Sequence, residues 1–323
     1  MTQPKSWKEW EKPLIELDEA LAKLRERSVT ATEEERHKID ETIKASEQRR
    51  DKYIEKKYAN LTPWEKVLVA RAEPRPYTLD YINALFTNFI ELQGDRLFGQ
   101  DHAIVGGPAA LDGQPVMVLG HQKGRNIQER QMRNFAMSKP EGYRKAIRLF
   151  QMADRFSMPI ITLVDTPAAD PGVESESRGI SEAIADSMLA MFEVKVPIVS
   201  VVIGEGGSGG AIGIGIGNTV LMQEHSVYSV IPPEGCAAIL WRDASLGPEA
   251  SAALRLTAQH ALEMSLIDGI IPEPFGGAHR DPIEAATLLK EAVQKALKPL
   301  LKQKPDALKA ARYSRYRALG KIG

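Results

Sequence analysis

The chain has 323 residues, of which 43% are hydrophobic and 26% are charged, and its formal net charge at pH 7 is −1. This composition is typical of a globular protein of one or two domains, and the near-neutral charge argues against bulk attraction to nucleic acid. The single cysteine, Cys236, excludes a disulfide within the chain and a cysteine-rich zinc site, and it fits a reducing, cytoplasmic setting. The first residues contain no apolar stretch typical of a signal peptide, and no apolar run is suited to span a membrane.

Residues 5–60 differ from the rest of the chain because they are dense in charge and contain no glycine. They predict two antiparallel helices. The first helix carries leucines at helical spacing, namely Leu14, Leu17, Leu21 and Leu24. The second begins at Thr32, which has capping-box spacing with Glu35. Because two helices have little core of their own, we expect this N-terminal arm (residues 1–60) to pack on the body of the protein or on a partner.

Residues 61–71 predict a further helix, and from about residue 103 the pattern becomes rich in strands. Two short apolar runs flank Asp112-Gly113, a dipeptide that is typical of hairpin turns. A basic, glycine-flanked loop follows the hairpin. Its Lys123 and Arg125 are candidates for binding an anionic group of a substrate, although the pattern also fits an exposed polar loop.

A helix and a buried strand then alternate twice along the chain. A helix at 143–156 precedes a strand at 159–164, and a helix at 177–193 precedes a strand that begins near Pro197. This alternation is typical of an α/β fold with a parallel sheet. In such folds, binding sites gather at the carboxyl ends of the strands.

The stretch from Pro197 to Gly217 carries the strongest functional signal. It begins with a β-branched run at 198–203, which predicts a strand, and it ends with a small-residue segment at 211–216, which predicts a short buried helix. Between them lie Gly204, Gly206, Gly207, Gly209 and Gly210. Glycine lets the backbone turn sharply and approach a ligand closely, and a helix start adds positive potential. We therefore expect a glycine turn that stabilises an anion or a developing oxyanion.

The residues alone leave four interpretations of this stretch open. The glycines spell GxGxxG and Glu224 lies about where a dinucleotide site places its ribose-binding acid, but so many glycines make a poor helix. Ser208 is the centre of a G-x-S-x-G motif, typical of a nucleophile elbow, yet no sequence feature pairs a histidine with it. The segment can also be an oxyanion hole of backbone N–H groups, or the glycines can simply allow a helix to pack tightly on a sheet. A P-loop is excluded because no GK[ST] closes the motif.

The remaining elements complete the α/β pattern. Strands are predicted at 218–222, 227–231 and 267–271, and helices at 232–241, 251–264 and 283–301. Cys236 lies in an apolar context, which indicates an inert buried thiol rather than a nucleophile. Residues 301–323 form a basic tail, which is most simply interpreted as a solvated surface helix.

Several collinear blocks of the sequence are together similar to one known family. They are RPYTLDY (Arg75–Tyr81), GHQKGR (Gly120–Arg125), PEGYRKA (Pro140–Ala146), GEGGSGGA (Gly204–Ala211), PEGCAAILW (Pro233–Trp241) and IIPEPFGGAHRD (Ile270–Asp281). Over nearly its whole length the chain resembles the alpha subunits of bacterial acetyl-CoA carboxylase carboxyltransferases. The resemblance implies a crotonase-like α/β fold of stacked ββα units over residues 61–300, preceded by the N-terminal helical hairpin.

The resemblance also implies an activity and a set of partners. The chain would transfer a carboxyl group from carboxybiotin to acetyl-CoA and form malonyl-CoA for fatty acid synthesis. The biotin would be carried on a separate biotin carboxyl carrier protein, and ATP would be used only by the biotin carboxylase component. A beta subunit would supply the other half of each active site, usually in an α2β2 assembly, and would carry the zinc, so no metal is expected in this chain. Alternatives are a carboxyltransferase for another acyl-CoA, such as propionyl-CoA, and a non-catalytic scaffold for carboxylase subunits.

The resemblance and the glycine stretch converge on Gly206 and Gly207. We expect their N–H groups to stabilise the ureido oxygen of biotin, which gains negative charge as the carboxyl group leaves. No protein nucleophile is needed, so Ser208 is expected to be dispensable as an attacking group. Roles in substrate binding are predicted for Lys123, Arg125, Gly172 and Gly209.

One loop departs from the family pattern. It reads DTPAADPG from Asp165 to Gly172, where the family usually has DTPGAYPG. Ala168 therefore replaces a glycine and Asp170 replaces an aromatic residue. We expect the carboxylate to alter the packing and polarity of the biotin pocket, and we assign Asp170 no role of its own.

Overall fold

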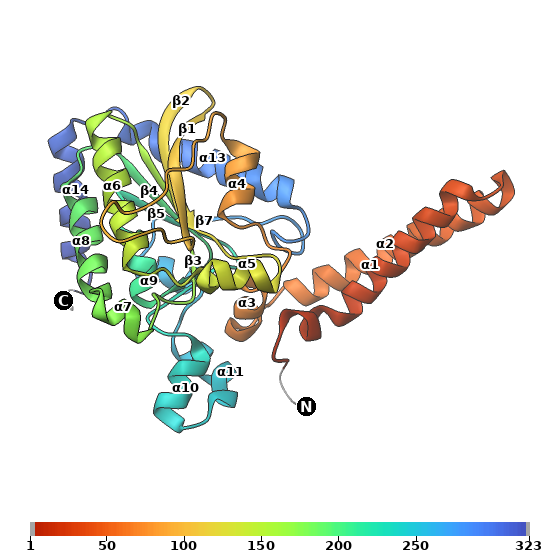
Figure 1. Cartoon of the computed structure of the whole chain (residues 1–323). Helices are drawn as coiled ribbons and strands as arrows, with labels where there is room; N and C mark the ends of the chain where they lie inside the picture. The colour runs from red at the N-terminus through yellow and green to blue at the C-terminus, as the bar shows by residue number, and fades with distance from the viewer. Residues whose placement is uncertain (1–3, 321–323) are drawn as a thin grey trace.

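The computed structural model describes residues 4–320, and its centre is a seven-stranded sheet (Figure 1). The strand order is β1-β2-β3-β4-β5-β7, and β6 pairs with the end of β4. The pair β1–β2 is antiparallel, whereas the other paired strands are parallel. The strands are β1 (Ile104–Leu111), β2 (Gln114–His121), β3 (Ile160–Thr166), β4 (Ile198–Gly207), β5 (Thr219–Gln223), β6 (Val227–Ser229) and β7 (Gly269–Ile271).

The predicted hairpin is confirmed as β1 and β2. Leu111 pairs with Gln114, so the turn consists of Asp112 and Gly113 alone, with φ angles of 47° and 82°. Positive φ at both central residues is the geometry that an Asp-Gly turn supplies. The second strand continues through His121, and the basic loop begins after it.

Helices cover both faces of the sheet, so its central strands are buried on both sides (Figure 1). Ile160 and Val164 of β3 pack in the core formed with α6 (Pro140–Arg155) and α8 (Ile180–Glu193). The alternate residues of the same strand pack with α4 (Thr78–Leu85) and α13 (Pro282–Leu300). Burial on both faces explains why these strands are continuous apolar runs in the sequence.

The other helices lie around this core. They are α3 (Pro63–Ala70), α5 (Ile127–Met132), α7 (Val173–Ser177), α9 (Ser208–Ile212), α10 (Pro233–Trp241), α11 (Gly247–Ala253), α12 (Ala258–Glu263) and α14 (Pro305–Ala318). Across residues 4–320, no helix combines the length and the apolar character needed to cross a membrane.

One predicted helix span is wrong, and another helix begins later than predicted. The span 251–264 is not one helix, because the chain turns at Arg255, with a φ of 50°, and Thr257 then caps α12 through its side chain. The helix predicted at 177–193 is confirmed as α8, which begins three residues later, at Ile180, because Gly179, with a φ of 78°, separates it from α7. Within 251–264 the apolar pattern continues across the turn, so periodicity alone did not reveal the break.

The predicted N-terminal hairpin is confirmed as α1 (Trp7–Thr30) and α2 (Glu33–Tyr58), which project together from the body (Figure 1). The expected capping box of Thr32 and Glu35 is present at the start of α2. At the base of the arm, Trp10 packs with Trp64 and other apolar residues of the body. The expected packing on the body is therefore confirmed for the base of the arm.

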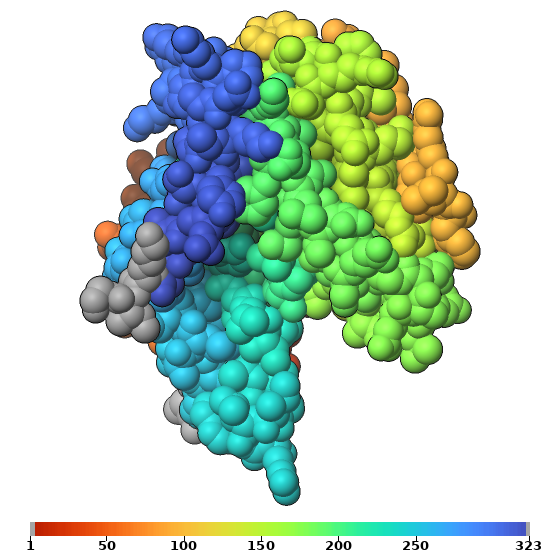
Figure 2. All heavy atoms as spheres, turned by 90° about the vertical axis from the view of Figure 1, so that its left-hand side faces the viewer, coloured from red at the N-terminus to blue at the C-terminus, as the bar shows by residue number. Residues whose placement is uncertain are grey.

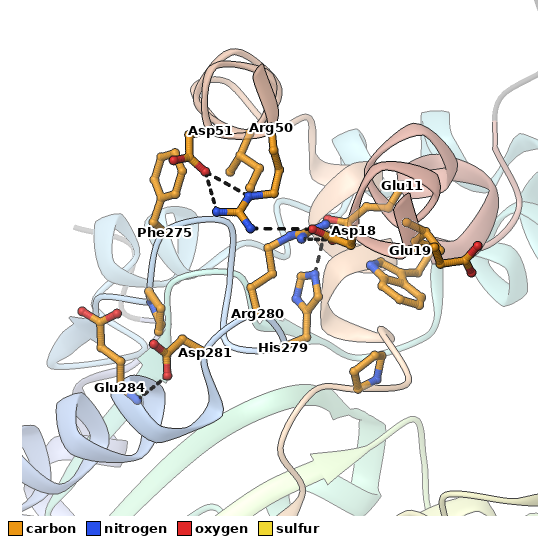
Figure 3. A pocket seen from close by; sticks show the side chains of 15 residues that line it. Glu11, Asp18, Glu19, Arg50, Asp51, Phe275, His279, Arg280, Asp281 and Glu284 are labelled. Atoms are coloured by element: carbon orange, nitrogen blue, oxygen red, sulfur yellow. Dashed lines mark hydrogen bonds and ion pairs between the residues drawn. The ribbon is translucent and has the colours of Figure 1, made fainter. Parts of the chain in front are cut away.

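Ion pairs between charged side chains also hold the arm on the body (Figure 3). The side chain of Glu11 is fully buried, and its carboxylate accepts a hydrogen bond from Arg280 Nη2 at 2.8 Å. His279 Nε2 lies 3.3 Å from the other carboxylate oxygen. Burial opposes the charge of Glu11, but His279 and Arg280 outweigh it and lower the pKa of Glu11. A cavity of about 490 Å³ lies beside this cluster, between the arm and the body.

The predicted solvated tail is wrong in one respect, because α14 packs on the body. Leu308 and Arg312 are buried, and the guanidinium of Arg312 donates to the carbonyl oxygens of Val194 and Val196, each at 2.8 Å. The basic tail therefore contains one buried cation, Arg312, whose N–H groups are hydrogen-bonded to backbone carbonyls. The last part of the predicted tail, residues 321–323, lies outside the described residues.

Replacing Arg312 with methionine is expected to lower the free energy of unfolding by about 2–4 kcal/mol. Each buried carbonyl left without a donor costs on the order of 1–3 kcal/mol, and methionine retains most of the apolar packing. Urea unfolding followed by circular dichroism measures the change. Arg317→Met is the matched control, since Arg317 is exposed on the same helix. An equal loss in both variants would show that the charge of the tail matters rather than the burial of Arg312.

Candidate active site

Of the glycines in the glycine-rich segment, Gly204, Gly206 and Gly207 belong to β4, and Gly209 and Gly210 belong to α9. The strand continues through Gly207, and its last three residues pair in parallel with β6, with Gly206 opposite Tyr228. The predicted glycine turn is therefore wrong, and so is the predicted helix at 211–216, because α9 begins at Ser208 and ends at Ile212. Glycine tolerates an extended conformation as well as a turn, and the pairing with β6, which was not predicted, decided between them.

Close packing explains part of the glycine content. A Cβ atom at Gly207 would lie 1.9 Å from the carbonyl oxygen of Pro167, and one at Gly210 would lie 2.5 Å from the carbonyl carbon of Ala168. The interpretation that these glycines allow tight packing is thus supported, although the packed neighbour is the loop after β3. Gly209 has more room, since its Cβ would lie 3.3 Å from Ile184 Cδ1.

Gly206 and Gly207 also line a small cavity of about 20 Å³. Pro167 borders it from the loop after β3, and residues 231–233 border it from the start of α10. Because glycine has no side chain, its part of the wall is peptide backbone. A cavity of this size has room for roughly one water-sized group.

Lys123 lies in a buried ion-pair network next to this cavity. Its Nζ is 2.7 Å from Asp165 Oδ1 and 3.2 Å from Glu205 Oε1. Burial opposes the charge of Lys123, but the two carboxylates outweigh it and raise its pKa. The ammonium group is therefore charged and already neutralised by the protein itself.

Glu205 links Lys123 to a second cation. Arg71 Nε lies 2.7 Å from Glu205 Oε2, and the guanidinium of Arg71 also pairs with Glu234 at the start of α10. Burial would raise the pKa of Glu205, but Arg71 and Lys123 lower it to about 2. The network therefore connects the strand that carries Gly206 with α10. Sequence analysis did not predict that Arg71, Asp165 and Glu234 belong to the site. The only signal for this network was Glu205, a glutamate between two glycines at the end of an apolar strand.

Arg125 makes different contacts from Lys123. Its guanidinium lies 3.9 Å from the centre of the Tyr77 ring and donates to the carbonyl oxygen of Arg75 at 3.0 Å and to the carboxylate of Asp80. Among the described residues, no hydrogen bond or ion pair joins Arg125 to the glycines of β4. The two basic residues predicted to act together are therefore placed in separate contact networks.

The loop around Asp170 and Gly172 is held by side-chain contacts. One carboxylate oxygen of Asp170 accepts from Asn134 Nδ2 at 3.1 Å, and the other accepts from Ser175 Oγ at 2.5 Å. Gly172 is the N-cap of α7, and its carbonyl oxygen accepts from the N–H of Ser175 at 2.9 Å. The carboxylate that departs from the family pattern is thus used to tie two segments together.

The geometry gives little support to the dinucleotide-binding and nucleophile-elbow interpretations of the glycine-rich stretch. The helix after β4 has only five residues, which is too short for a dinucleotide-binding unit, and Glu224 instead accepts from the N–H of Glu273. Ser208 does have a positive φ of 54°, as a nucleophile elbow requires. Within residues 4–320, however, no histidine ring is hydrogen-bonded to Ser208. The buried His121 also makes a poor base, since burial lowers its pKa to about 3.

The chain matches, over residues 7–320, the family described as acetyl co-enzyme A carboxylase carboxyltransferase-like. It is 52% identical over 314 residues to the acetyl-coenzyme A carboxylase carboxyl transferase subunit alpha of Geobacter metallireducens, with 97% of each chain covered. The protein of the same name from Thermus thermophilus is 51% identical over 312 residues, which cover 97% of this chain and 98% of the relative.

Solved structures with the same fold include the transcarboxylase 12S with methylmalonyl-coenzyme A and methylmalonic acid bound, at a TM-score of 0.58 and 19% identity. That match covers 72% of this chain and 43% of the other. A Pseudomonas malonate decarboxylase hetero-tetramer in complex with coenzyme A also has a TM-score of 0.58, at 16% identity, with 75% and 95% covered. These matches confirm the predicted crotonase-like α/β fold. The full-length similarity shows that this chain belongs to the acetyl-CoA carboxylase carboxyltransferase family, as an alpha-type subunit.

Proposed function

We propose that the chain transfers the carboxyl group of carboxybiotin to acetyl-CoA, together with a beta subunit, and so forms malonyl-CoA for fatty acid biosynthesis. The observation that carries this proposal is the identity of about half of all residues, over 97% of the chain, to relatives named as the alpha subunit of this carboxyl transferase. These relatives are all named for acetyl-CoA, so the alternative of propionyl-CoA is not favoured.

The finer assignments belong to the same proposal. The biotin is carried on a separate biotin carboxyl carrier protein, ATP is used only by the biotin carboxylase component, and the assembly with the beta subunit is α2β2. The single cysteine supports a reducing compartment, the cytoplasm. We divide the chain into an arm (1–60), a carboxyltransferase domain (61–300) and a tail (301–323), whose helix α14 packs on this domain.

The chemistry of the Gly206–Gly207 cavity fits the ureido oxygen of biotin. The cavity accommodates one oxygen-sized group, and the wall that these residues give it is backbone. Bound carboxybiotin supplies the carboxyl group and an oxygen that gains negative charge. We propose that the peptide groups of Gly206 and Gly207 hold this oxygen, which is worth about 3–4 kcal/mol of barrier for each donor in comparable oxyanion holes.

The side chains next to the cavity position β4 in this proposal. Lys123 and Arg71 are each paired with carboxylates, which neutralise their charge. Lys123 holds Asp165 and Glu205 together and thereby fixes the end of β4 against β3. Direct contacts of Lys123, Arg125, Gly172 and Gly209 with substrate stay predictions.

Reconstitution tests the proposed function directly. We expect the chain mixed with the beta subunit from the same cell to decarboxylate malonyl-CoA in the presence of free biotin, the reverse reaction. Each subunit alone is expected to be inactive at the same concentration. Turnover by this chain alone would contradict a divided active site. Turnover of propionyl-CoA in the forward direction, at a kcat/KM above that of acetyl-CoA, would contradict the substrate.

A further inference from the structure

Four large apolar side chains in and just before α10 are exposed. The exposed fractions are 75% for Val230, 72% for Ile239, 65% for Leu240 and 44% for Trp241, and we call these four residues the α10 patch. Figures 1 and 2 show α10 standing clear of the body of the protein.

The sequence of α10 is unusual for such a position. It reads PEGCAAILW, and its last three residues are large and apolar. Successive helical positions point about 100° apart, so these residues expose apolar surface on more than one side of the helix. A helix that is apolar all round is normally buried, and large exposed apolar patches mark interaction sites. Cys236 on the same helix is only partly buried, which corrects the expectation of a buried thiol.

The α10 patch adjoins the candidate site. Ile231, Pro232 and Pro233, which connect Val230 to α10, border the same cavity as Gly206 and Gly207. Arg71 further ties the start of α10 to β4, since it pairs with both Glu234 and Glu205. A protein that covers the patch therefore lies at the rim of this cavity.

We propose that the α10 patch is the docking surface for the beta subunit, an inference that rests on the proposed function. Carboxyl transfer needs a place for the acyl-CoA thioester beside the place for biotin, whereas the cavity of about 20 Å³ at Gly206 and Gly207 has room for only one oxygen-sized group. A second copy of this chain would add only a second copy of the same glycine segment, and no different place for the thioester. The occupant that completes the site is thus a different subunit, with an apolar surface that covers Ile239, Leu240 and Trp241.

The test is the double substitution Ile239→Glu with Leu240→Glu in the full chain. Both side chains are exposed, so two glutamates leave the isolated chain folded, but they oppose burial of the patch. We expect affinity for the beta subunit, measured by sedimentation velocity, to fall at least 100-fold. Leu189→Glu is the matched control, because Leu189 is 60% exposed on α8 and lies outside the patch. Its affinity is expected to stay within threefold of that of the unchanged chain.

The possible outcomes separate the inference from the proposed function. Binding of the double variant at unchanged affinity overturns the inference, as does an unchanged chain that does not bind the beta subunit. Self-association of the unchanged chain that the substitutions abolish would assign the patch to a second copy and also overturn it. A complex that forms through the patch but does not turn over malonyl-CoA supports the inference and contradicts the function. Hydrogen exchange on the unchanged chain is independent of any variant: slower exchange of residues 233–241 on mixing supports docking, and unchanged exchange opposes it.

Discussion

Replacing Gly207 with alanine is expected to lower turnover of malonyl-CoA by the reconstituted enzyme about 100- to 1,000-fold, the loss typical of removing one oxyanion-hole donor. The added Cβ would lie 1.9 Å from the carbonyl oxygen of Pro167, so β4 or the loop after β3 has to move. Either movement displaces the peptide group that we assign to the biotin oxygen, and misplacement by about 1 Å can cost 100-fold in rate. Gly206→Ala is expected to be milder, because its nearest contact, at 2.8 Å, is the ring of Tyr228, a side chain rather than backbone.

The measurement has to separate chemistry from folding and assembly. Gly269→Ala is the matched control, since it also adds a methyl group to a strand of the sheet, where the nearest contact is Leu221 Cδ2 at 3.3 Å. Thermal unfolding and binding to the beta subunit are measured for all three variants. A Gly207→Ala enzyme that assembles and keeps turnover within tenfold of the unchanged enzyme would show that the glycine serves packing only.

Local signals in the sequence were sufficient for most of the elements. The capping box at Thr32, the Asp112-Gly113 turn and the apolar run at 198–203 each act within a few residues, and each is where it was predicted. Their physics depends on hydrogen bonds and side-chain spacing along one segment, which a sequence displays directly. The same is true of the α/β alternation, which follows from strands buried on both faces.

The candidate site depended on contacts that a sequence does not display. Whether Gly204 to Gly207 form a turn or a strand was decided by pairing with β6, which lies about 20 residues later in the chain. The ion-pair partners of Lys123 were not predicted, because they lie 42 and 82 residues away in the chain, at Asp165 and Glu205. Arg312 was predicted to be solvated because nothing near it in the sequence indicates the carbonyls that bind it. The contacts that the sequence did not predict are therefore long-range ones, namely strand pairing and the partners of charged side chains.

The second large effect is expected at the fully buried ion pair of Arg75 and Glu273. Both side chains are at most 1% exposed, and two nitrogens of Arg75 donate to the two carboxylate oxygens at 2.8 and 2.6 Å. Arg75 also donates to the carbonyl oxygen of Ile203, just before the glycines of β4. Glu273→Gln leaves a buried guanidinium without its counter-charge, and the free energy of unfolding is expected to fall by about 3–5 kcal/mol. Glu263→Gln is the control, because it removes a carboxylate from the exposed pair with Arg255 and is expected to cost less than about 1 kcal/mol.

The pH dependence of unfolding gives this prediction a second readout. Burial would raise the pKa of Glu273, but Arg75 outweighs it and lowers the pKa to about 2. An unfolded glutamate titrates near pH 4.3, so the carboxylate's contribution to stability is complete above that pH and is lost as the pH falls toward 2. The difference in unfolding free energy between the unchanged chain and Glu273→Gln is therefore expected to be constant from pH 7 to about pH 5 and to shrink below it. A difference that stays constant down to pH 3 would show that the glutamine variant loses packing or hydrogen bonds rather than the charge opposite Arg75.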